Sequence, residues 1–224
     1  MSNHYRAVIF DLDGVLADSE GLHILAWQQL FAALGLPFET RWSSEWVGVP
    51  DSEIATMVAG RFSVRIGATE LLNRKRHQFR ALVRARLKPF EGTAAELQRC
   101  ACCSVPMAIG TSSVRAEASL MLKVLGFHVY FPVIVAGDDV SRIKPAPDIY
   151  LEAARRLDVP PAQCIVLEDS PAGITAALEA DMAVVAVATS FAPYQLKKAA
   201  QVFAAPAKAI HWLCSNLNFG TAGG

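Results

Sequence analysis

The chain has 224 residues, of which 53% are hydrophobic and 19% are charged, a composition typical of a globular protein. It carries 21 Lys and Arg residues and 21 Asp and Glu residues, so its formal net charge is +0. This balance excludes a basic field over the whole protein that would draw it to nucleic acid or to an anionic membrane. Any site for an anion must therefore be local.

No segment has the pattern of a membrane span or a secretory leader. The longest apolar run, Met182 to Ala188, is far too short to cross a bilayer. The residues before Asp11 lack a signal-peptide core and a cleavage pattern. We therefore expect a cytoplasmic protein.

Short apolar runs rich in Val and Ile predict the strands of a sheet. Most of these runs show no polar alternation, which indicates strands that are buried on both faces, as in a parallel sheet. In chain order they are Ala7–Phe10, Met107–Ile109, Val133–Val135, Ile165–Leu167 and Ala183–Val187. Helical patterns follow at Thr93–Cys103, Val114–Leu125, Pro147–Leu157 and Pro171–Glu179. This alternation predicts an α/β fold with a doubly wound parallel sheet.

The segment between the first two strands has a different pattern. Residues 19–88 contain no comparable apolar run and predict three or four helices, including a basic helix over Leu71–Leu87. The chain therefore forms one strand, leaves for a helical insertion, and returns to complete the sheet. We expect a core domain of residues 1–18 and 89–224, and a helical domain of residues 19–88.

Five cysteines are present, and three of them cluster in the segment Arg99 to Ser104. Cys100 and Cys103 have the C-x-x-C spacing of a redox or zinc pair, but no second pair and no nearby histidine completes a zinc site. The segment is also typical of a helix end that packs on a sheet. We therefore expect buried, reduced thiols.

Polar side chains follow each of the first four predicted strands. The segments are Asp11-Leu12-Asp13-Gly14, Gly110-Thr111-Ser112-Ser113, Gly137-Asp138-Asp139 with Lys144-Pro145, and Glu168-Asp169-Ser170. Because ligands of parallel α/β sheets bind beyond the carboxyl ends of the strands, these groups are expected to converge on one site.

Each segment taken alone has a simpler interpretation. The D-x-D-G segment could begin a calcium loop, but Gly14 stands at the fourth position of the loop rather than the sixth. Thr111 could be a turn residue, Lys144 a surface charge, and Asp169 part of a helix cap. Together these interpretations require a coincidence at four strand ends, so a common site is favoured.

The segments resemble the motifs of the haloacid dehalogenase superfamily, in the branch with a helical cap inserted after the first strand. D-L-D-G-V at residues 11–15, T-S-S at 111–113, K-P-A-P-D at 144–148 and E-D-S at 168–170 occur in the family's order. The resemblance extends from Val8 to about Val187 and is greatest to sugar-phosphate phosphatases and to the β-phosphoglucomutase group. It implies a phosphoric monoester hydrolase with residues 19–88 as the cap.

The resemblance also implies roles for the strand-end residues. Mg²⁺ would bind the carboxylates of Asp11 and Asp169 and the backbone carbonyl of Asp13, and Glu168 would hold a metal-bound water or support the ligands. Asp11 would form an aspartyl-phosphate, and Asp13 would act as general acid and base. The groups expected to hold the phosphoryl oxygens are Thr111, Lys144, Ser113 and the backbone N–H groups of Leu12 and Ser112.

Substrate selection is expected to lie in the cap, where the informative residues are His23, Trp27, Lys75 and the loop Gly48-Val49-Pro50-Asp51. His23 is either a substrate ligand or a satisfied histidine of the cap, and Trp27 is more typical of the cap core. Lys75 lies where related capped enzymes place a basic group towards the substrate, but it could equally be a solvated lysine on a basic helix.

These observations predict a Mg²⁺-dependent phosphatase of a small phosphorylated metabolite, a sugar or polyol phosphate. The alternatives are a phosphomutase of the β-phosphoglucomutase type and a non-catalytic protein that binds a phosphometabolite. Mutases of that type have an arginine in the cap loop that begins Gly-Val, where this chain has Pro50-Asp51. Neither a nucleic-acid partner nor a membrane partner is expected, and the sequence does not indicate a protein partner.

Overall fold

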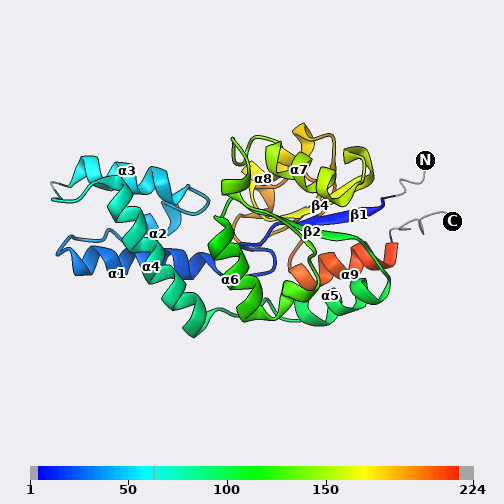
Figure 1. The fold of residues 1–224 in the computed structure, drawn as a ribbon, viewed down its shortest axis with the longest axis horizontal. Helices are drawn as coiled ribbons and strands as arrows, with labels where there is room; N and C mark the ends of the chain where they lie inside the picture. The colour runs from blue at the N-terminus through cyan, green and yellow to red at the C-terminus, as the bar shows by residue number, and fades with distance from the viewer. Residues whose placement is uncertain (1–4, 63, 217–224) are drawn as a thin grey trace. The chain divides into compact units, whose positions relative to one another are not determined.

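The computed structural model describes residues 5–62 and 64–216. The chain divides into two compact units. The sheet unit comprises the chain up to Asp18 and from Lys88 onward, and the helical unit runs from Ser19 to Leu87. Figure 1 shows the course of the chain through both units.

The described residues of the sheet unit form one sheet of six parallel strands in the order β3-β2-β1-β4-β5-β6. The strands are β1 (Ala7–Phe10), β2 (Met107–Gly110), β3 (Val133–Val135), β4 (Cys164–Glu168), β5 (Ala183–Val187) and β6 (Val202–Phe203). The predicted parallel α/β fold is confirmed. β6 was not predicted, because its two half-buried residues are too few to form a recognisable apolar run.

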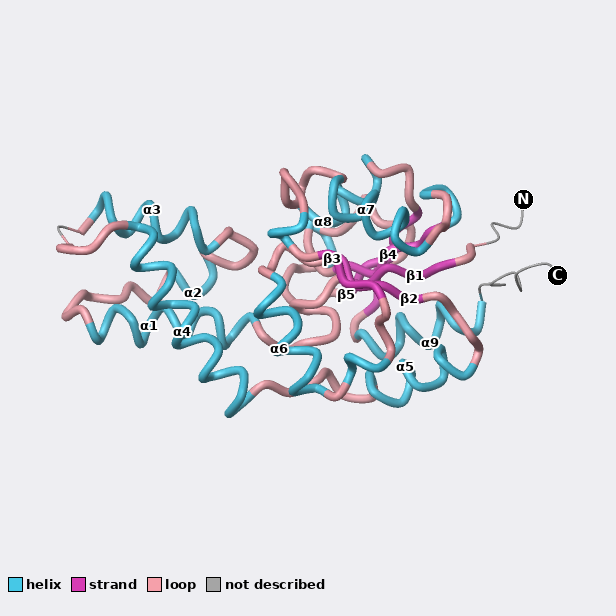
Figure 2. The backbone as a smooth tube through the Cα atoms, viewed as in Figure 1, coloured by secondary structure: helices cyan, strands magenta, loops and turns pink. Residues whose placement is uncertain are grey.

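Helices cover both faces of the sheet, as the continuous apolar strands predicted. They are α5 (Thr93–Cys102), α6 (Arg115–Leu125), α7 (Asp148–Leu157), α8 (Pro171–Glu179) and α9 (Pro206–Asn216). Figure 2 shows the strands between α7 and α8 on one side and α5 and α9 on the other. Ile9 of β1 and Val166 of β4 belong to the same buried cluster as Ile149 of α7 and Ile174 of α8. Among the described helices, none combines the length and the apolar character that a bilayer crossing requires.

The order of the strands places a topological switch point beside β1. The chain moves outward from β1 to β2 and β3, and then returns through α7 to β4 on the other side of β1. In open α/β sheets, the carboxyl ends of the strands at such a point form the usual ligand crevice. Short 3₁₀ turns complete the connections, at Phe127–Val129, Gly137–Asp139, Pro161–Gln163 and Pro193–Gln195.

The helical unit contains α1 (Glu20–Ala33), α2 (Trp42–Glu45), α3 (Asp51–Arg61) and α4 (Ala68–Arg86). An aromatic cluster forms its core: the rings of Trp42 and Trp46 stack at 4.9 Å between centroids, and Phe31 packs edge-on against Trp42 at 5.3 Å. Trp27 is fully buried in the same cluster, as expected of a core residue. The unit thus has a hydrophobic core of its own.

The cysteines correct one expectation from the sequence. Cys100 of α5 and Cys214 of α9 form a disulfide, whereas Cys102 and Cys103 are exposed and free. The expectation of buried, reduced thiols in the segment Arg99 to Ser104 is wrong, because Cys100 is buried but oxidised, and Cys102 and Cys103 are reduced but exposed. Outside this segment, Cys164 has a free thiol whose pKa burial raises to about 11. The predicted cytoplasmic location stays a prediction.

Loss of the disulfide should destabilise the sheet unit. Cys100 and Cys214 are separated by 114 positions in the sequence, so the bond closes a long loop in the unfolded chain. Cys214→Ala should lower stability by about 2–5 kcal/mol, and therefore Tm by roughly 5–15 °C, in thermal unfolding followed by circular dichroism. Cys102→Ala, at an exposed free cysteine, is the matched control and should leave Tm unchanged. Equal Tm values for the wild type and Cys214→Ala under oxidising conditions would contradict this role.

Candidate active site

The predicted strand-end residues meet at the carboxyl edge of β1 and β4. The register pairs Phe10 with Leu167, and the N–H of Asp11 donates to the carbonyl of Leu167 at 2.9 Å. Asp11 therefore leaves β1 directly beside the end of β4. One carboxylate oxygen from each of Asp11, Glu168 and Asp169 lies within 4.8 Å of the other two, and all three residues are buried.

Lys144 is the only basic residue that the described contacts place among these acids. Its Nζ donates to Asp11 Oδ1 and, at 2.7 Å, to Glu168 Oε1. The Lys144 side chain is only 5% exposed. Burial alone lowers the pKa of Lys144, but the charges of Asp11 and Glu168 and the hydrogen bonds to them raise this pKa above its ordinary value. The ammonium group is therefore charged at neutral pH.

Glu168 is held by five hydrogen-bond donors. Its Oε1 accepts from Lys144 and, at 2.8 Å, from the hydroxyl of Tyr150. Its Oε2 accepts from the N–H groups of Asp169 and Ser170 at 2.8 and 2.9 Å, and from the Ser170 hydroxyl at 3.0 Å. Burial opposes ionisation, but Lys144 and these donors lower the pKa of Glu168. Glu168 is thus an ionised anchor for Lys144.

The site carries more negative than positive charge. Burial, together with the charges of neighbouring acids, raises the pKa of Asp11 and that of Asp169 well above their ordinary values. Lys144 offsets only part of this charge, since its single ammonium group pairs with Asp11 and Glu168 while three buried carboxylates lie together. A divalent cation would balance the remainder, and a set of carboxylate oxygens suits a hard cation. The donor set therefore fits a divalent metal site.

Asp13 faces a second group of predicted residues. The hydroxyl of Ser113 donates to Asp13 Oδ2 at 2.8 Å, and that of Thr111 lies 3.5 Å from the same oxygen. Thr111 Oγ1 also accepts from the Ser113 N–H at 3.1 Å, so the loop after β2 is held against Asp13. Asp13 is only half-buried, whereas Asp11 is buried, so the two acids have different environments. Of the predicted backbone donors, Leu12 has a buried side chain and Ser112 is exposed.

Gly14 makes room for Asp169 at the turn after β1. Its φ of +75° lies in the left-handed region, which strains residues with a side chain. A Cβ at this position would lie 1.8 Å from Asp169 Oδ2. The hydroxyl of Thr189, after β5, donates to the Gly14 carbonyl at 2.6 Å and lies 3.5 Å from Asp169 Oδ2. The turn and the Asp169 carboxylate are thereby fixed against each other.

The sequence interpretation missed Tyr150 and Thr189. Tyr150 lies six residues after Lys144 and is fully buried, and its ring is 4.8 Å from the Lys144 Nζ. No pattern at the start of α7 distinguishes it from an ordinary core residue. Thr189 had a usable signal, because it closely follows β5 and the strand-end rule applies to β5 as it does to the other strands.

The helical unit contains a separate polar cluster formed by His23, Asp51 and Lys75. Lys75 Nζ lies 2.5 Å from Asp51 Oδ2 and 2.6 Å from His23 Nδ1, and the indole N–H of Trp27 donates to Asp51 Oδ1 at 2.9 Å. The His23 ring stacks on Phe79 at 3.9 Å. Burial opposes ionisation of Asp51, but the hydrogen bond with His23 and the charge of Lys75 lower its pKa.

Lys75 is not a solvated surface residue. Its side chain is 0% exposed, so the interpretation of a solvated lysine on a basic helix is wrong. The physical reason is local: Asp51 of α3 and His23 of α1 supply the partners that a buried ammonium group requires.

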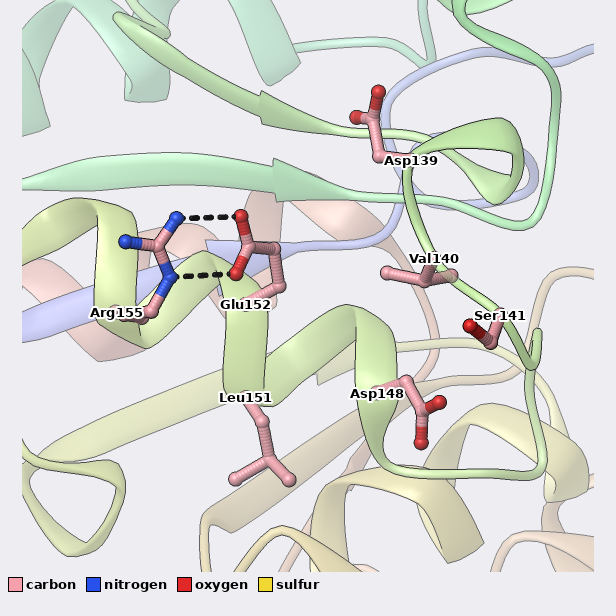
Figure 3. Close-up of a pocket in the computed structure, with 7 residues that line it drawn as sticks. All are labelled: Asp139, Val140, Ser141, Asp148, Leu151, Glu152 and Arg155. Atoms are coloured by element: carbon pink, nitrogen blue, oxygen red, sulfur yellow. Dashed lines mark hydrogen bonds and ion pairs between the residues drawn. The ribbon is translucent and has the colours of Figure 1, made fainter.

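A surface pocket of about 300 Å³ lies elsewhere on the sheet unit, over α7 and the loop that precedes it (Figure 3). Its lining residues are Asp139, Val140, Ser141, Asp148, Leu151, Glu152 and Arg155. Each carboxylate in this lining is paired with arginine: Asp139 with Arg115, Asp148 with Arg142, and Glu152 with Arg155. Of the strand-end residues expected to converge on the site, Asp139 lines this pocket instead, where it is paired with Arg115. The acids of the pocket leave no unbalanced charge for an ion.

Known proteins are similar to this chain in both sequence and fold. A family model described as haloacid dehalogenase-like hydrolase matches residues 8–187. The fructose-1-phosphate phosphatase YqaB of Escherichia coli is 33% identical over 182 residues, which cover 81% of this chain and 96% of that protein. The β-phosphoglucomutase of Bacillus subtilis is 33% identical over 189 residues, covering 81% and 83% of the two chains.

A solved structure agrees with these matches. CbbY from Rhodobacter sphaeroides, crystallised in complex with phosphate, superposes with a TM-score of 0.82 and 26% identity, over 91% of this chain and 96% of that one. The family model spans most of the chain and every strand-end motif of the site. The chain therefore belongs to the haloacid dehalogenase-like hydrolase family and is an enzyme of the phosphoric monoester hydrolase class.

Proposed function

We propose that this enzyme is a Mg²⁺-dependent phosphatase that releases inorganic phosphate from a small sugar or polyol phosphate. The observation that carries the proposal is the position of the Lys144 ammonium group. It lies between the buried carboxylates of Asp11 and Glu168, beside Asp169, at the switch point of the sheet. A carboxylate next to a fixed cation, at the mouth of a parallel sheet, suits attack on a phosphate monoester.

Asp11 is the proposed nucleophile. One of its carboxylate oxygens attacks phosphorus in line with the leaving alkoxide, which forms an aspartyl-phosphate and breaks the ester bond. Lys144, together with the bound cation, would favour the ionised form of Asp11 against the effect of burial, and Lys144 attracts the phosphate dianion. Glu168 accepts a hydrogen bond from Lys144, and its four other donors hold Glu168 in place. Thr111 and Ser113, with the N–H groups of Leu12 and Ser112, are the proposed ligands of the phosphoryl oxygens.

Asp13 is the proposed general acid and base. It gives a proton to the leaving alkoxide and then takes one from the water that hydrolyses the aspartyl-phosphate. Its position suits this role, since it is half-buried and its Oδ2 accepts a hydrogen bond from the Ser113 hydroxyl. A carboxyl group that protonates a leaving group serves phosphate esters with basic alkoxides, such as sugar phosphates.

Asp11 and Asp169, with the backbone carbonyl of Asp13, are the proposed ligands of Mg²⁺. The bound cation would offset the negative charge of these carboxylates and of the phosphate dianion. Because its Oε atoms already accept five hydrogen bonds, Glu168 is assigned to support Lys144 rather than to bind the ion directly.

The helical unit is proposed to act as a cap that closes over the site and selects the substrate. Its polar cluster supports a phosphatase over a mutase. A mutase must bind a bisphosphate intermediate, which needs a second cationic site, but here the ammonium group of Lys75 is paired with Asp51. The Asp51 carboxylate would repel a second phosphate in contact with it by about 1–4 kcal/mol. The mutase remains the second candidate, because a β-phosphoglucomutase is among the relatives.

The proposed function is tested by offering the purified protein a panel of hexose, pentose and polyol monophosphates with Mg²⁺. We expect release of inorganic phosphate, no stimulation by a sugar bisphosphate, and no activity in excess chelator. Conversion of a hexose 1-phosphate to its 6-phosphate faster than phosphate release would show a mutase. An absence of metal-dependent turnover on the whole panel would contradict the proposed substrate class.

Lys75 provides a test of the cap's role. Lys75→Met keeps the length of the side chain but removes the ammonium group that links Asp51 to His23. We expect KM for the preferred sugar phosphate to rise about tenfold, which corresponds to the loss of one charged hydrogen bond, with little change for p-nitrophenyl phosphate. Arg74→Met, at an exposed cation on the same helix, is the matched control. Equal effects of Lys75→Met on both esters would remove Lys75 from substrate selection.

A further inference from the structure

Two loops of the sheet unit bring the site together. The threonine loop, residues 111–113, follows β2 and carries Thr111 and Ser113 to Asp13. The lysine loop, residues 137–144, follows β3 and carries Lys144 to Asp11 and Glu168. The geometry of the site therefore depends on how these loops are held relative to each other.

Backbone contacts join the bases of the two loops. The N–H of Thr111 donates to the Val135 carbonyl at 3.0 Å, and the N–H of Gly137 donates to the Ser113 carbonyl at 2.9 Å. A Cβ at Gly137 would lie 2.4 Å from the carbonyl oxygen of Ser112, so only glycine allows the loops to approach this closely. These contacts fix where each loop begins. Other interactions must hold the remainder of the lysine loop in place.

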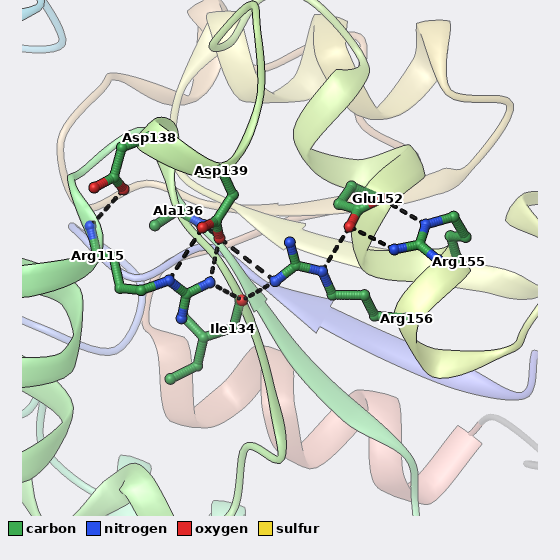
Figure 4. Close-up of polar contacts among 8 residues, drawn as sticks. All are labelled: Arg115, Ile134, Ala136, Asp138, Asp139, Glu152, Arg155 and Arg156. Atoms are coloured by element: carbon green, nitrogen blue, oxygen red, sulfur yellow. Dashed lines mark hydrogen bonds and ion pairs between the residues drawn. The ribbon is translucent and has the colours of Figure 1, made fainter.

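A pair of side chains clasps the loops just beyond this contact, as Figure 4 shows. Arg115, the first residue of α6, donates from Nε to Asp139 Oδ1 at 3.1 Å and from Nη2 to Asp139 Oδ2. The same Nη2 donates to the Ile134 carbonyl at 2.8 Å. Asp139 Oδ2 also accepts from the Ala136 N–H at 2.9 Å. The Arg115–Asp139 pair thus links the start of α6, which follows the threonine loop, to the first turn of the lysine loop.

A second contact runs beside the pair. The backbone N–H of Arg115 donates to Asp138 Oδ1 at 2.7 Å, so the lysine loop also caps the start of α6. The Asp139 side chain is only 16% exposed. Burial opposes its ionisation, but the hydrogen bond with Arg115 and the Ala136 N–H lower its pKa. The link is therefore a charged, two-point contact, which fixes orientation as well as distance.

We infer that Arg115 and Asp139 are positioning residues for catalysis. They hold the threonine loop and the lysine loop in one arrangement, in which Ser113 meets Asp13 while Lys144 meets Asp11. Neither residue is assigned a contact with the substrate, and both act through the loops that they join. The inference rests on the proposed function of Asp11, Asp13 and Lys144.

The test uses Arg115→Gln and Asp139→Asn, which remove the charged pair while keeping polar side chains. Glu152→Gln is the matched control, because Glu152 belongs to the same polar network through Arg155 and Arg156 but joins residues of α7 only. Two esters are compared in the presence of Mg²⁺: p-nitrophenyl phosphate, whose leaving group needs no proton, and the preferred sugar phosphate, whose alkoxide does. Thermal unfolding shows how much of each variant is folded.

We expect kcat for the sugar phosphate to fall about 10- to 100-fold in both variants, as a misplacement of about 1 Å would produce. kcat for p-nitrophenyl phosphate should fall less, because the proton from Asp13 matters less for that ester. The double variant should lose much less activity than the product of the two single losses, because both substitutions break the same Arg115–Asp139 pair. Glu152→Gln should match the wild type.

Three kinetic results would overturn the inference: wild-type kcat in a folded variant, equal losses on the two esters, or losses that multiply in the double variant. Arg115→Lys serves if the other variants do not fold, since lysine keeps the charge but not the two-point contact with Asp139.

A readout without turnover separates this inference from the proposed function. Inorganic phosphate, titrated calorimetrically with Mg²⁺ present, should bind about tenfold more weakly to the variants than to Glu152→Gln. Equal binding would overturn the inference even if the wild type cleaves no ester.

Discussion

Asp11→Asn should reduce kcat by about 10³-fold or more, because the substitution removes the covalent route and leaves a much weaker nucleophile. The amide keeps the shape of the carboxylate and can still accept a hydrogen bond from Lys144, so the sheet unit should fold. The measurement is phosphate release from the preferred substrate, with circular dichroism as the check on folding.

A matched control shows whether the loss of activity comes from the Asp11 carboxylate or from any Asp-to-Asn substitution. Asp181 is exposed and lies in the turn before β5, with a φ of +58° that asparagine tolerates. Asp181→Asn should therefore retain wild-type kcat. Near wild-type turnover in a folded Asp11→Asn protein would exclude Asp11 as the nucleophile.

Lys144→Met should lower kcat/KM by about 10²–10³-fold, since it removes a cation that contacts the nucleophile and would contact the phosphoryl group. It should also destabilise the protein by about 3–5 kcal/mol, because it leaves buried carboxylates without their partner. Activity is measured with saturating Mg²⁺, and stability by thermal unfolding. Lys123→Met, at an exposed lysine of α6, is the control for both measurements.

A double variant separates the two effects of Lys144. Adding Glu168→Gln to Lys144→Met removes one of the carboxylates that the lysine had neutralised, so part of the lost stability should return. Activity should not return, because the cation beside Asp11 is still missing. Recovery of activity together with stability would mean that Lys144 only supports the fold.

The fold and the grouping of the strand-end residues were predictable because each depends on a short local pattern. The continuous apolar runs of β1 and β4 indicate strands buried on both faces, and parallel strands bring their carboxyl ends to one edge. Asp11 and Glu168 are 157 positions apart in the sequence, yet both follow from this rule. The family, and with it the hydrolase class, was recognised from the same residues.

The features that were missed depend on contacts between helices, which no local pattern records. Lys75 is buried because α1 and α3 present His23 and Asp51 to it, and the rotation of each helix about its axis decides this. The Cys100–Cys214 disulfide likewise depends on the packing of α5 against α9. Tyr150 resembles any aromatic core residue until its hydroxyl is seen to meet Glu168.

The most direct test of the central claim is to trap the phosphoryl group on Asp11. The wild-type enzyme is mixed with its preferred sugar phosphate and Mg²⁺, quenched in acid within the first turnover, and digested for mass spectrometry. The account predicts one added phosphoryl group on the peptide that contains Asp11, which hydroxylamine removes, and none in Asp11→Asn. Phosphate release by an active enzyme with no phosphoryl group on that peptide at any quench time, or with the group on another residue, would contradict it.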